Sequence, residues 1–94
     1  MRDFQVIYRI LSKYRGLLET PGNPTEAITP ETLDTSVHHM KSILVMLGDA
    51  GHLKNIVDNG GSDVSYRKSE ITLKGLEYLV DSEIMKAAAK EQGR

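Results

Sequence analysis

Histidine, the side chain best suited to metal binding or to acid–base work near neutral pH, occurs three times in this chain. His38 and His39 are adjacent, so on a helix their side chains diverge by about 100° and cannot share an ion as an i, i+4 pair does. His52 lies further along, and no carboxylate is spaced to complete a ligand set with it. The chain has no cysteine, which excludes thiolate ligands and cysteine nucleophiles. We therefore predict neither a metal site nor a cofactor.

The hydroxyl and glycine-rich segments carry no catalytic motif. Ser36, Ser42 and Ser62 lack the surrounding sequence of a nucleophile elbow. The segment "DNGGSD" (58–63) has neither the lysine nor the following helix of a phosphate-binding loop, and is typical of a turn. We predict that the chain is not an enzyme.

Polar and basic residues at two places could instead contact double-stranded DNA. In a helix-turn-helix protein the second helix of the motif offers its N-terminal residues to base edges in the major groove, and a wing can touch the adjacent backbone. The residues in these positions are Ser36, His38, His39, Lys41 and Ser42 on a helix, with Arg67 and Lys68 as phosphate contacts on the returning strand of a hairpin. Arg9, Lys13 and Arg15 would add backbone contacts if the first helix faces the duplex.

The charge distribution argues against strong attraction to DNA. The formal net charge is −1, so the chain as a whole does not attract nucleic acid. No arginine or glutamine on the helix is placed for bidentate base readout. Asp58 and Asp63 flank the tip of the expected wing.

The alternative is a module that binds another protein or a second copy of itself without binding DNA. The helices carry more apolar residues than a solvent-facing helix needs, and the spare positions are Val45, Met46, Ile84 and Met85. The small residues 87–89 ("AAA") would let another helix approach closely. Methionine is also a common filler of core gaps, so each methionine could equally be buried within the chain.

Apolar periodicity and turn residues define the elements that would position these side chains. A helix is expected over residues 3–19, then a polar loop over 20–26, a brief strand at 27–28 and a short helix capped by Thr29. Ser36 caps a third helix that Gly51 closes, residues 52–72 form a β-hairpin around "DNGG", and a last helix follows Thr72. Val37 is among the expected inner positions of the third helix, and Leu73 and Val80 are among those of the last helix. The segment 81–83 could restart this helix, and the tail after about residue 88 could fray.

Gly75 stands in the first turn of that last helix. Glycine costs about 1 kcal/mol against alanine in a helix interior. The interpretation we favour is that the missing Cβ lets the helix lie close against the hairpin or the first helix. The alternative is a glycine with no packing role.

The runs "ITLKGLEYL" (71–79), "MLGDAGHLKNI" (46–56) and "ITPETL" (28–33) resemble the YjcQ-like family, small winged-helix-like proteins of bacterial and phage genomes. The resemblance implies a fold and a phage or mobile-element context, and it supplies no active site or ligand. "TSVHHMK" (35–41) and "DNGGSD" depart from the family pattern, which puts contacts inferred for relatives and a DNA-touching wing in doubt here.

We therefore expect one α+β domain over residues 1–94, a winged helix-turn-helix with the order helix, short strand, two helices, β-hairpin wing and C-terminal helix. The start does not resemble a signal peptide and no apolar run reaches the roughly 18 residues of a membrane span, so a cytoplasmic location without a membrane partner is expected. The expected function is that of a DNA-binding or transcription-regulatory protein, with the protein-interaction or homodimerisation module as the alternative.

Overall fold

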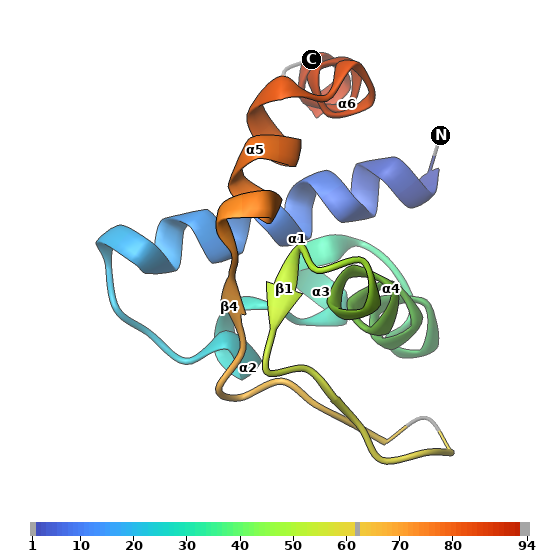
Figure 1. Ribbon diagram of the computed structural model, residues 1–94. Coiled ribbons are helices and arrows are strands. Elements are labelled where there is room, and N and C mark those ends of the chain that lie inside the picture. Colours follow the sequence, from blue (N-terminus) through green and yellow to red (C-terminus); the bar gives the residue numbers. More distant parts are fainter. Residues whose placement is uncertain (1, 62, 93–94) are drawn as a thin grey trace.

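The computed structural model describes residues 2–61 and 63–92, and within them the chain is α+β (Figure 1). The helices are α1 (Arg2–Glu19), α2 (Pro24–Ala27), α3 (Pro30–Leu33), α4 (Val37–Asp49), α5 (Leu73–Asp81) and α6 (Glu83–Gln92). The strands are β1 (Leu53–Lys54), β2 (Val57–Asp58), β3 (Val64–Ser65) and β4 (Glu70–Ile71). The α+β prediction is confirmed.

The four strands form one bent antiparallel hairpin between α4 and α5. β1 pairs with β4, placing Leu53 opposite Ile71, and β2 pairs with β3 nearer the tip. Asn55 adopts a left-handed φ of 64° between the two ladders. The hairpin predicted for residues 52–72 is confirmed; position 62, inside its turn, lies outside the described residues.

The core lies where α1 runs between the other helices (Figure 1). α1 buries Val6, Ile7, Ile10, Leu11 and Tyr14, and α4 buries Met40, Ile43, Leu44 and Leu47. Burying one such side chain contributes about 1.5–3 kcal/mol. The helical stripes predicted for α1 and α4 are therefore confirmed over most of their length, although Leu18 and Val37 at their ends are 55% and 52% exposed.

The strand predicted at residues 27–28 is wrong. Ala27 ends α2, and Ile28 is its C-cap, whose N–H donates to the carbonyl of Pro24 at 2.8 Å. Asn23 caps this helix by accepting from the N–H of Thr25 at 2.9 Å. Pro24 is thus the first residue of a helix, a position where its missing N–H costs nothing. It does not merely belong to a loop that ends the preceding helix.

The predicted helix starts after Thr29, Ser36 and Thr72 are confirmed. Thr29 forms a capping box with Thr32, Ser36 accepts from the N–H of His39, and Thr72 accepts from the N–H of Gly75. Each such cap stabilises its helix by about 1 kcal/mol. Gly51 follows α4 with a φ of +85°, the left-handed geometry expected of a terminator.

Gly75 lies against the base of the hairpin, at His52 and Ile71, as the close-approach interpretation predicts. A Cβ at this position would lie 2.3 Å from the carbonyl oxygen of His52 and 2.8 Å from Cγ1 of Ile71. Because the buried side of α5 is centred on Gly75, the expected inner positions Leu73 and Val80 were wrong. They point away from it and are 73% and 60% exposed.

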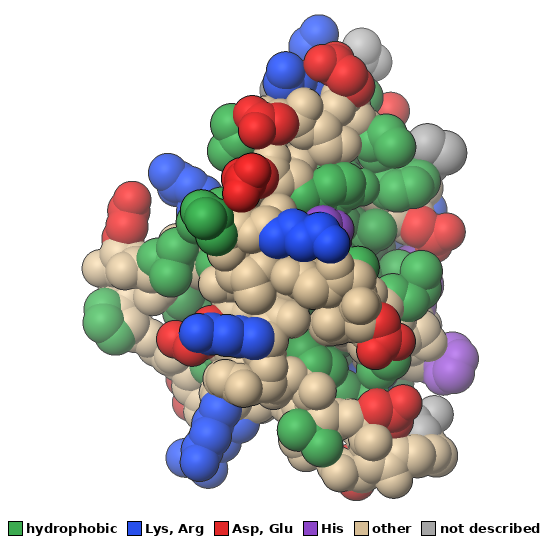
Figure 2. Space-filling view, viewed as in Figure 1, with side chains coloured by type: hydrophobic (Ala, Val, Ile, Leu, Met, Phe, Trp, Pro, Cys, Tyr) green, Lys and Arg blue, Asp and Glu red, His purple; other side chains and the backbone are tan. Residues whose placement is uncertain are grey.

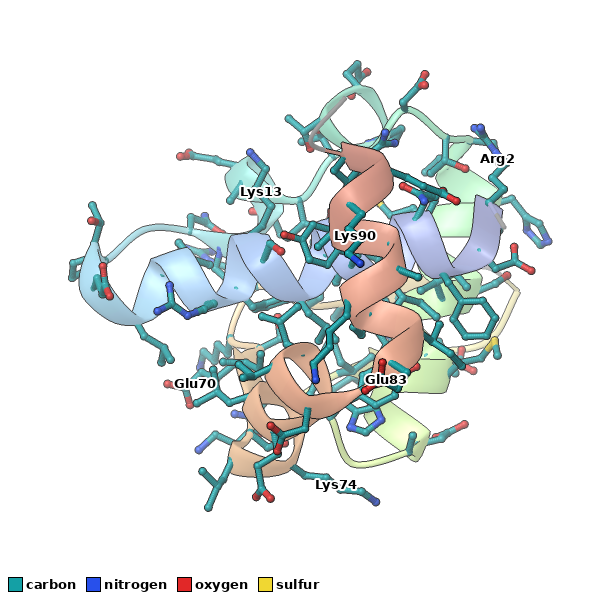
Figure 3. The ribbon with its side chains drawn as sticks, turned by 90° about the horizontal axis from the view of Figure 1, so that it is seen from above. Arg2, Lys13, Glu70, Lys74, Glu83 and Lys90 are labelled. Atoms are coloured by element: carbon teal, nitrogen blue, oxygen red, sulfur yellow. The ribbon has the colours of Figure 1, made fainter. Side chains whose placement is uncertain are left out.

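The C-terminal segment is two helices that break at Ser82, which has an extended backbone. α6 crosses α1 (Figure 3), and its Met85 and Ala88 are buried. Arg9 of α1 donates to the side chain of Gln92 at 2.8 Å. The segment after residue 88 is helical as far as Gln92 and packs on α1. Residues 93–94 lie outside the described residues.

Candidate nucleic-acid interface

α1 fixes the turn that joins α3 to α4. The Arg9 guanidinium donates to the carbonyl of Leu33, the last residue of α3, at 2.9 Å, and Arg2 donates to the carbonyl of Asp34. Asp34 has a left-handed φ of 53°, and Ser36 is extended at the N-cap of α4. The two arginines therefore hold a tight turn between α3 and α4, and Arg9 is engaged inside the chain rather than directed to a partner.

The predicted contact residues on α4 differ in how they are held. Ser36, His38 and Ser42 are exposed, and Lys41 is half-buried. His39 is hydrogen-bonded through both ring nitrogens, to Oγ1 of Thr35 at 2.6 Å and to Oδ1 of Asp3 at 2.7 Å. Because these two bonds use both ring nitrogens, His39 ties α4 to the start of α1 and offers no ring nitrogen to a base edge in this arrangement.

A hollow of about 370 Å³ separates the outer side of α4 from the hairpin tip. Its α4 wall consists of His38, Lys41, Ser42, Val45 and Met46, and its hairpin wall of Asp58, Gly60, Gly61 and Val64. The fold thus brings His38, Lys41 and Ser42, three of the five predicted helix contacts, beside the predicted wing. The hairpin wall contributes a carboxylate and no basic residue.

Arg67 and Lys68 lie in the turn between β3 and β4 and line a different hollow, of about 310 Å³. Its other walls come from the end of α1 and the loop after it, including Leu17, Leu18 and Pro21. The predicted DNA contacts are therefore separated: His38, Lys41 and Ser42 line the hollow beside the hairpin tip, whereas Arg67 and Lys68 line this second hollow, and the two hollows share none of their lining residues. Ser36 and His39 line neither of them.

A buried polar chain beneath that turn was missed in the sequence. Ser69 is 3% exposed, and its hydroxyl donates to the carbonyl of Tyr66 and accepts from the hydroxyl of Tyr14 at 2.6 Å. The Tyr66 hydroxyl in turn donates to the carbonyl of Ile28 at 2.7 Å. Burial raises the pKa of Tyr14 to about 12, so Tyr14 remains a neutral donor. The Tyr14–Ser69 and Tyr66–Ile28 bonds span 55 and 38 residues of sequence, so no local pattern could have indicated them.

Several other basic residues are engaged within the chain. Lys54 pairs with Glu70 at 3.3 Å, Lys86 with Glu83 at 3.4 Å, and Lys74 donates to the carbonyl of Ala50. Basic and acidic side chains are interspersed over the face drawn in Figure 2. Lys13 and Glu70 lie on opposite sides of α1 in Figure 3.

His52 lies between α4 and α5 and stacks on Tyr78, with ring centroids 4.6 Å apart. Its Nδ1 is buried without a hydrogen-bond partner among the described residues. Burial, and then the nearby charge of Lys74, hold the pKa of His52 below its usual value. No group of three His, Asp or Glu side chains within residues 2–61 and 63–92 could hold a metal ion.

The apolar residues that favoured a protein partner do not form one patch. Met85 is fully buried, which corrects its assignment as a spare surface residue, and Val45 is half-buried. Met46 is 60% exposed in the hollow beside the hairpin, whereas Ile84 is 41% exposed in a separate hollow between α1 and α6. None of the helices in the described part of the chain combines the length and apolarity that crossing a membrane requires.

Comparison with known proteins identifies the family. The family model described as "YjcQ protein" matches residues 8–92, which runs from within α1 to the end of α6. No curated protein and no solved structure matched the chain. The match covers the hairpin and the helices that flank it. The chain therefore belongs to the YjcQ family.

Proposed function

We propose that the chain is a winged-helix protein that binds double-stranded DNA and acts as a regulator in a phage or mobile-element context. Supporting this is the arrangement of α3, a fixed turn and α4 beside a β-hairpin, the order in which winged-helix proteins place a recognition helix and a wing. The observation that carries the proposal is that His38 and Ser42, two exposed residues in the first half of α4, line the same hollow as the hairpin tip. The role is one of binding rather than catalysis.

In this proposal the first turns of α4 enter the major groove. α4 has no acidic residue in its first turn, so the positive end of its helix dipole is not neutralised there. His38 and Ser42 are the side chains for base edges, and Lys41 is the phosphate contact on this surface. Since His39 is held by Asp3 and Thr35, it serves to orient α4 rather than to read bases.

The proposal implies weak and only mildly salt-dependent binding. Each neutralised phosphate contributes about −0.9 to the slope of log K against log salt concentration on B-form DNA. With Lys41 as the one basic side chain lining this surface, the expected slope is about −1 to −2. A slope much steeper than this would require Arg67 and Lys68, from the other hollow, to contact the same duplex.

The test is a fluorescence-anisotropy titration of a random-sequence duplex at low and moderate salt. We expect Lys41→Gln to weaken binding and to flatten the salt slope by about one unit. Lys90→Gln on α6, with the same loss of one positive charge, serves as the matched control and should bind like the wild type. Absence of binding at low salt, where screening is weakest, would remove the DNA proposal.

A second candidate is a protein-interaction or homodimerisation module. The observation that favours it is Met46, which is 60% exposed beside Val45 in the hollow between α4 and the hairpin. Flexible methionines are common on surfaces that adapt to protein partners. Sedimentation over a range of concentrations tests the homodimer: Met46→Gln should abolish self-association, and Leu73→Gln, an equally polar change at an exposed apolar residue of α5, should not. A wild type that stays monomeric, or a dimer that survives Met46→Gln, would contradict it.

A further inference from the structure

The hairpin tip contains a sequence with its own covalent chemistry. The chain has three asparagines: Asn23 precedes Pro24, Asn55 precedes Ile56, and Asn59 precedes Gly60. A backbone nitrogen that follows asparagine can attack the side-chain amide, and glycine offers the least steric hindrance to this ring closure because it has no Cβ. Asn59 is therefore the asparagine whose neighbour least obstructs the reaction.

The structure leaves this pair open to solvent. Asn59 and Gly60 are both exposed, just beyond the last paired residue of β2. Gly60 has a φ of +87°, and a Cβ built on it would meet nothing within 4 Å. Water and hydroxide thus reach both the amide and the attacking nitrogen.

We propose that Asn59 is a site of spontaneous deamidation. The Gly60 nitrogen attacks Cγ of Asn59, so that a new N–Cγ bond forms and the Cγ–Nδ2 bond breaks. The proton lost from the Gly60 nitrogen and the leaving amide group depart as ammonia, and a five-membered succinimide remains. Water then opens the succinimide at either carbonyl, which gives aspartate or isoaspartate at position 59. No oxidant, reductant or enzyme is required.

Asp58 controls the rate of this reaction. Its Oδ1 accepts a hydrogen bond from the Gly60 N–H at 2.9 Å. The attacking species is the deprotonated nitrogen, and a neighbouring carboxylate that accepts the N–H favours the protonated form. Asn59 Nδ2 also donates to Oγ of Ser65 at 3.1 Å, which restrains the side chain. Asp58 therefore slows a reaction that the sequence otherwise favours.

The other two asparagines are internal controls. The Pro24 nitrogen carries no hydrogen and cannot close the ring on Asn23. Ile56 is β-branched and half-buried, and Asn55 Nδ2 donates to the carbonyl of Lys68 at 3.2 Å. Neither position combines an exposed amide with an unhindered neighbouring N–H.

Deamidation would alter the surface that faces α4. It adds a carboxylate beside Asp58 and Asp63 and takes the formal net charge from −1 to −2. Isoaspartate also lengthens the backbone, which disturbs the hydrogen bond from the Asn59 N–H to the carbonyl of Asp63 at 2.8 Å. Both changes occur at the tip of the hairpin wall of the hollow that His38 and Lys41 line.

The test is to incubate the full chain in mildly alkaline buffer at body temperature and to follow its intact mass and its peptide map. We expect the replacement of NH₂ by OH to accumulate at Asn59 ahead of Asn55 and Asn23. Asp58→Ser should accelerate conversion several-fold, and Gly60→Ala should slow it several-fold.

Three results would overturn the inference. They are an unchanged Asn59 while Asn55 converts, an Asp58→Ser variant that converts no faster than the wild type, and a Gly60→Ala variant that converts as fast. Because the readout is a mass change at a named residue, it is independent of whether the chain binds DNA.

Discussion

Replacing Gly75 with alanine sets a small helix-propensity gain against a large steric conflict. Alanine favours a helix interior by about 1 kcal/mol over glycine, and by less in a first turn. The new Cβ, however, would lie 2.3 Å from the His52 carbonyl oxygen. That oxygen cannot withdraw freely, because it accepts from the Thr72 N–H at 3.0 Å and from the Thr72 hydroxyl at 3.1 Å.

The magnitude follows from these opposing terms. Overpacking of this kind costs about 1–3 kcal/mol, and weakening one of the hydrogen bonds to His52 adds about 1 kcal/mol. After the propensity gain is subtracted, we expect a net loss of about 2 kcal/mol in the free energy of unfolding. For a chain of this size each 1 kcal/mol corresponds to about 4–8 °C in Tm.

The assay is urea unfolding followed by circular dichroism, with Gly16→Ala as the matched control. Gly16 lies in α1, is exposed, and has nothing within 4 Å of a built Cβ. The same substitution there should stabilise the chain by about 0.5–1 kcal/mol. If Gly75→Ala were as stable as the wild type while Gly16→Ala behaved as expected, the close approach of α5 to the hairpin would be refuted.

Three further predictions concern other contacts. Burial lowers the pKa of His52 in the folded chain, so the unfolded chain takes up a proton at a higher pH than the folded chain does. The free energy of unfolding should therefore fall as the pH drops below about 6.5. Urea unfolding at a series of pH values should show a smaller fall for His52→Gln than for the wild type. Tyr14→Phe should cost about 1 kcal/mol in the same assay through loss of its hydrogen bond to Ser69, and a variant as stable as the wild type would contradict the buried polar chain. Met85→Ala should cost about 2–5 kcal/mol, whereas Met46→Ala at a 60% exposed residue should stay within about 0.5 kcal/mol; equal losses would show that the two methionines do not differ in burial.

Local signals in the sequence predicted most of the elements. The caps at Ser36 and Thr72, the terminator at Gly51 and the turn at Gly60 depend on side chains and backbone geometry within a few residues, so they can be recognised without the fold. Pro24 shows the limit of this reasoning. A proline ends a preceding helix and begins a following one equally well, and here the Asn23 cap decides for a start.

The composition of the site depends on contacts distant in sequence. Only the bend of the hairpin at Asn55, together with the burial of Ser69 beneath Tyr14, sets Arg67 and Lys68 against the end of α1 rather than beside α4. The packing of α6 on α1 likewise joins the two ends of the chain. Periodicity defines which side of a helix is apolar, but it does not define which surface that side meets.

The most direct test of the proposed DNA-binding surface is an NMR titration of the nitrogen-labelled chain with duplex DNA at low salt. The account predicts amide shifts concentrated in residues 36–46 of α4 and in the hairpin tip, with little change in α5 and α6. Shifts confined to the turn at residues 67–70, or no shifts at all, would contradict the assignment of α4 as the DNA-contacting helix.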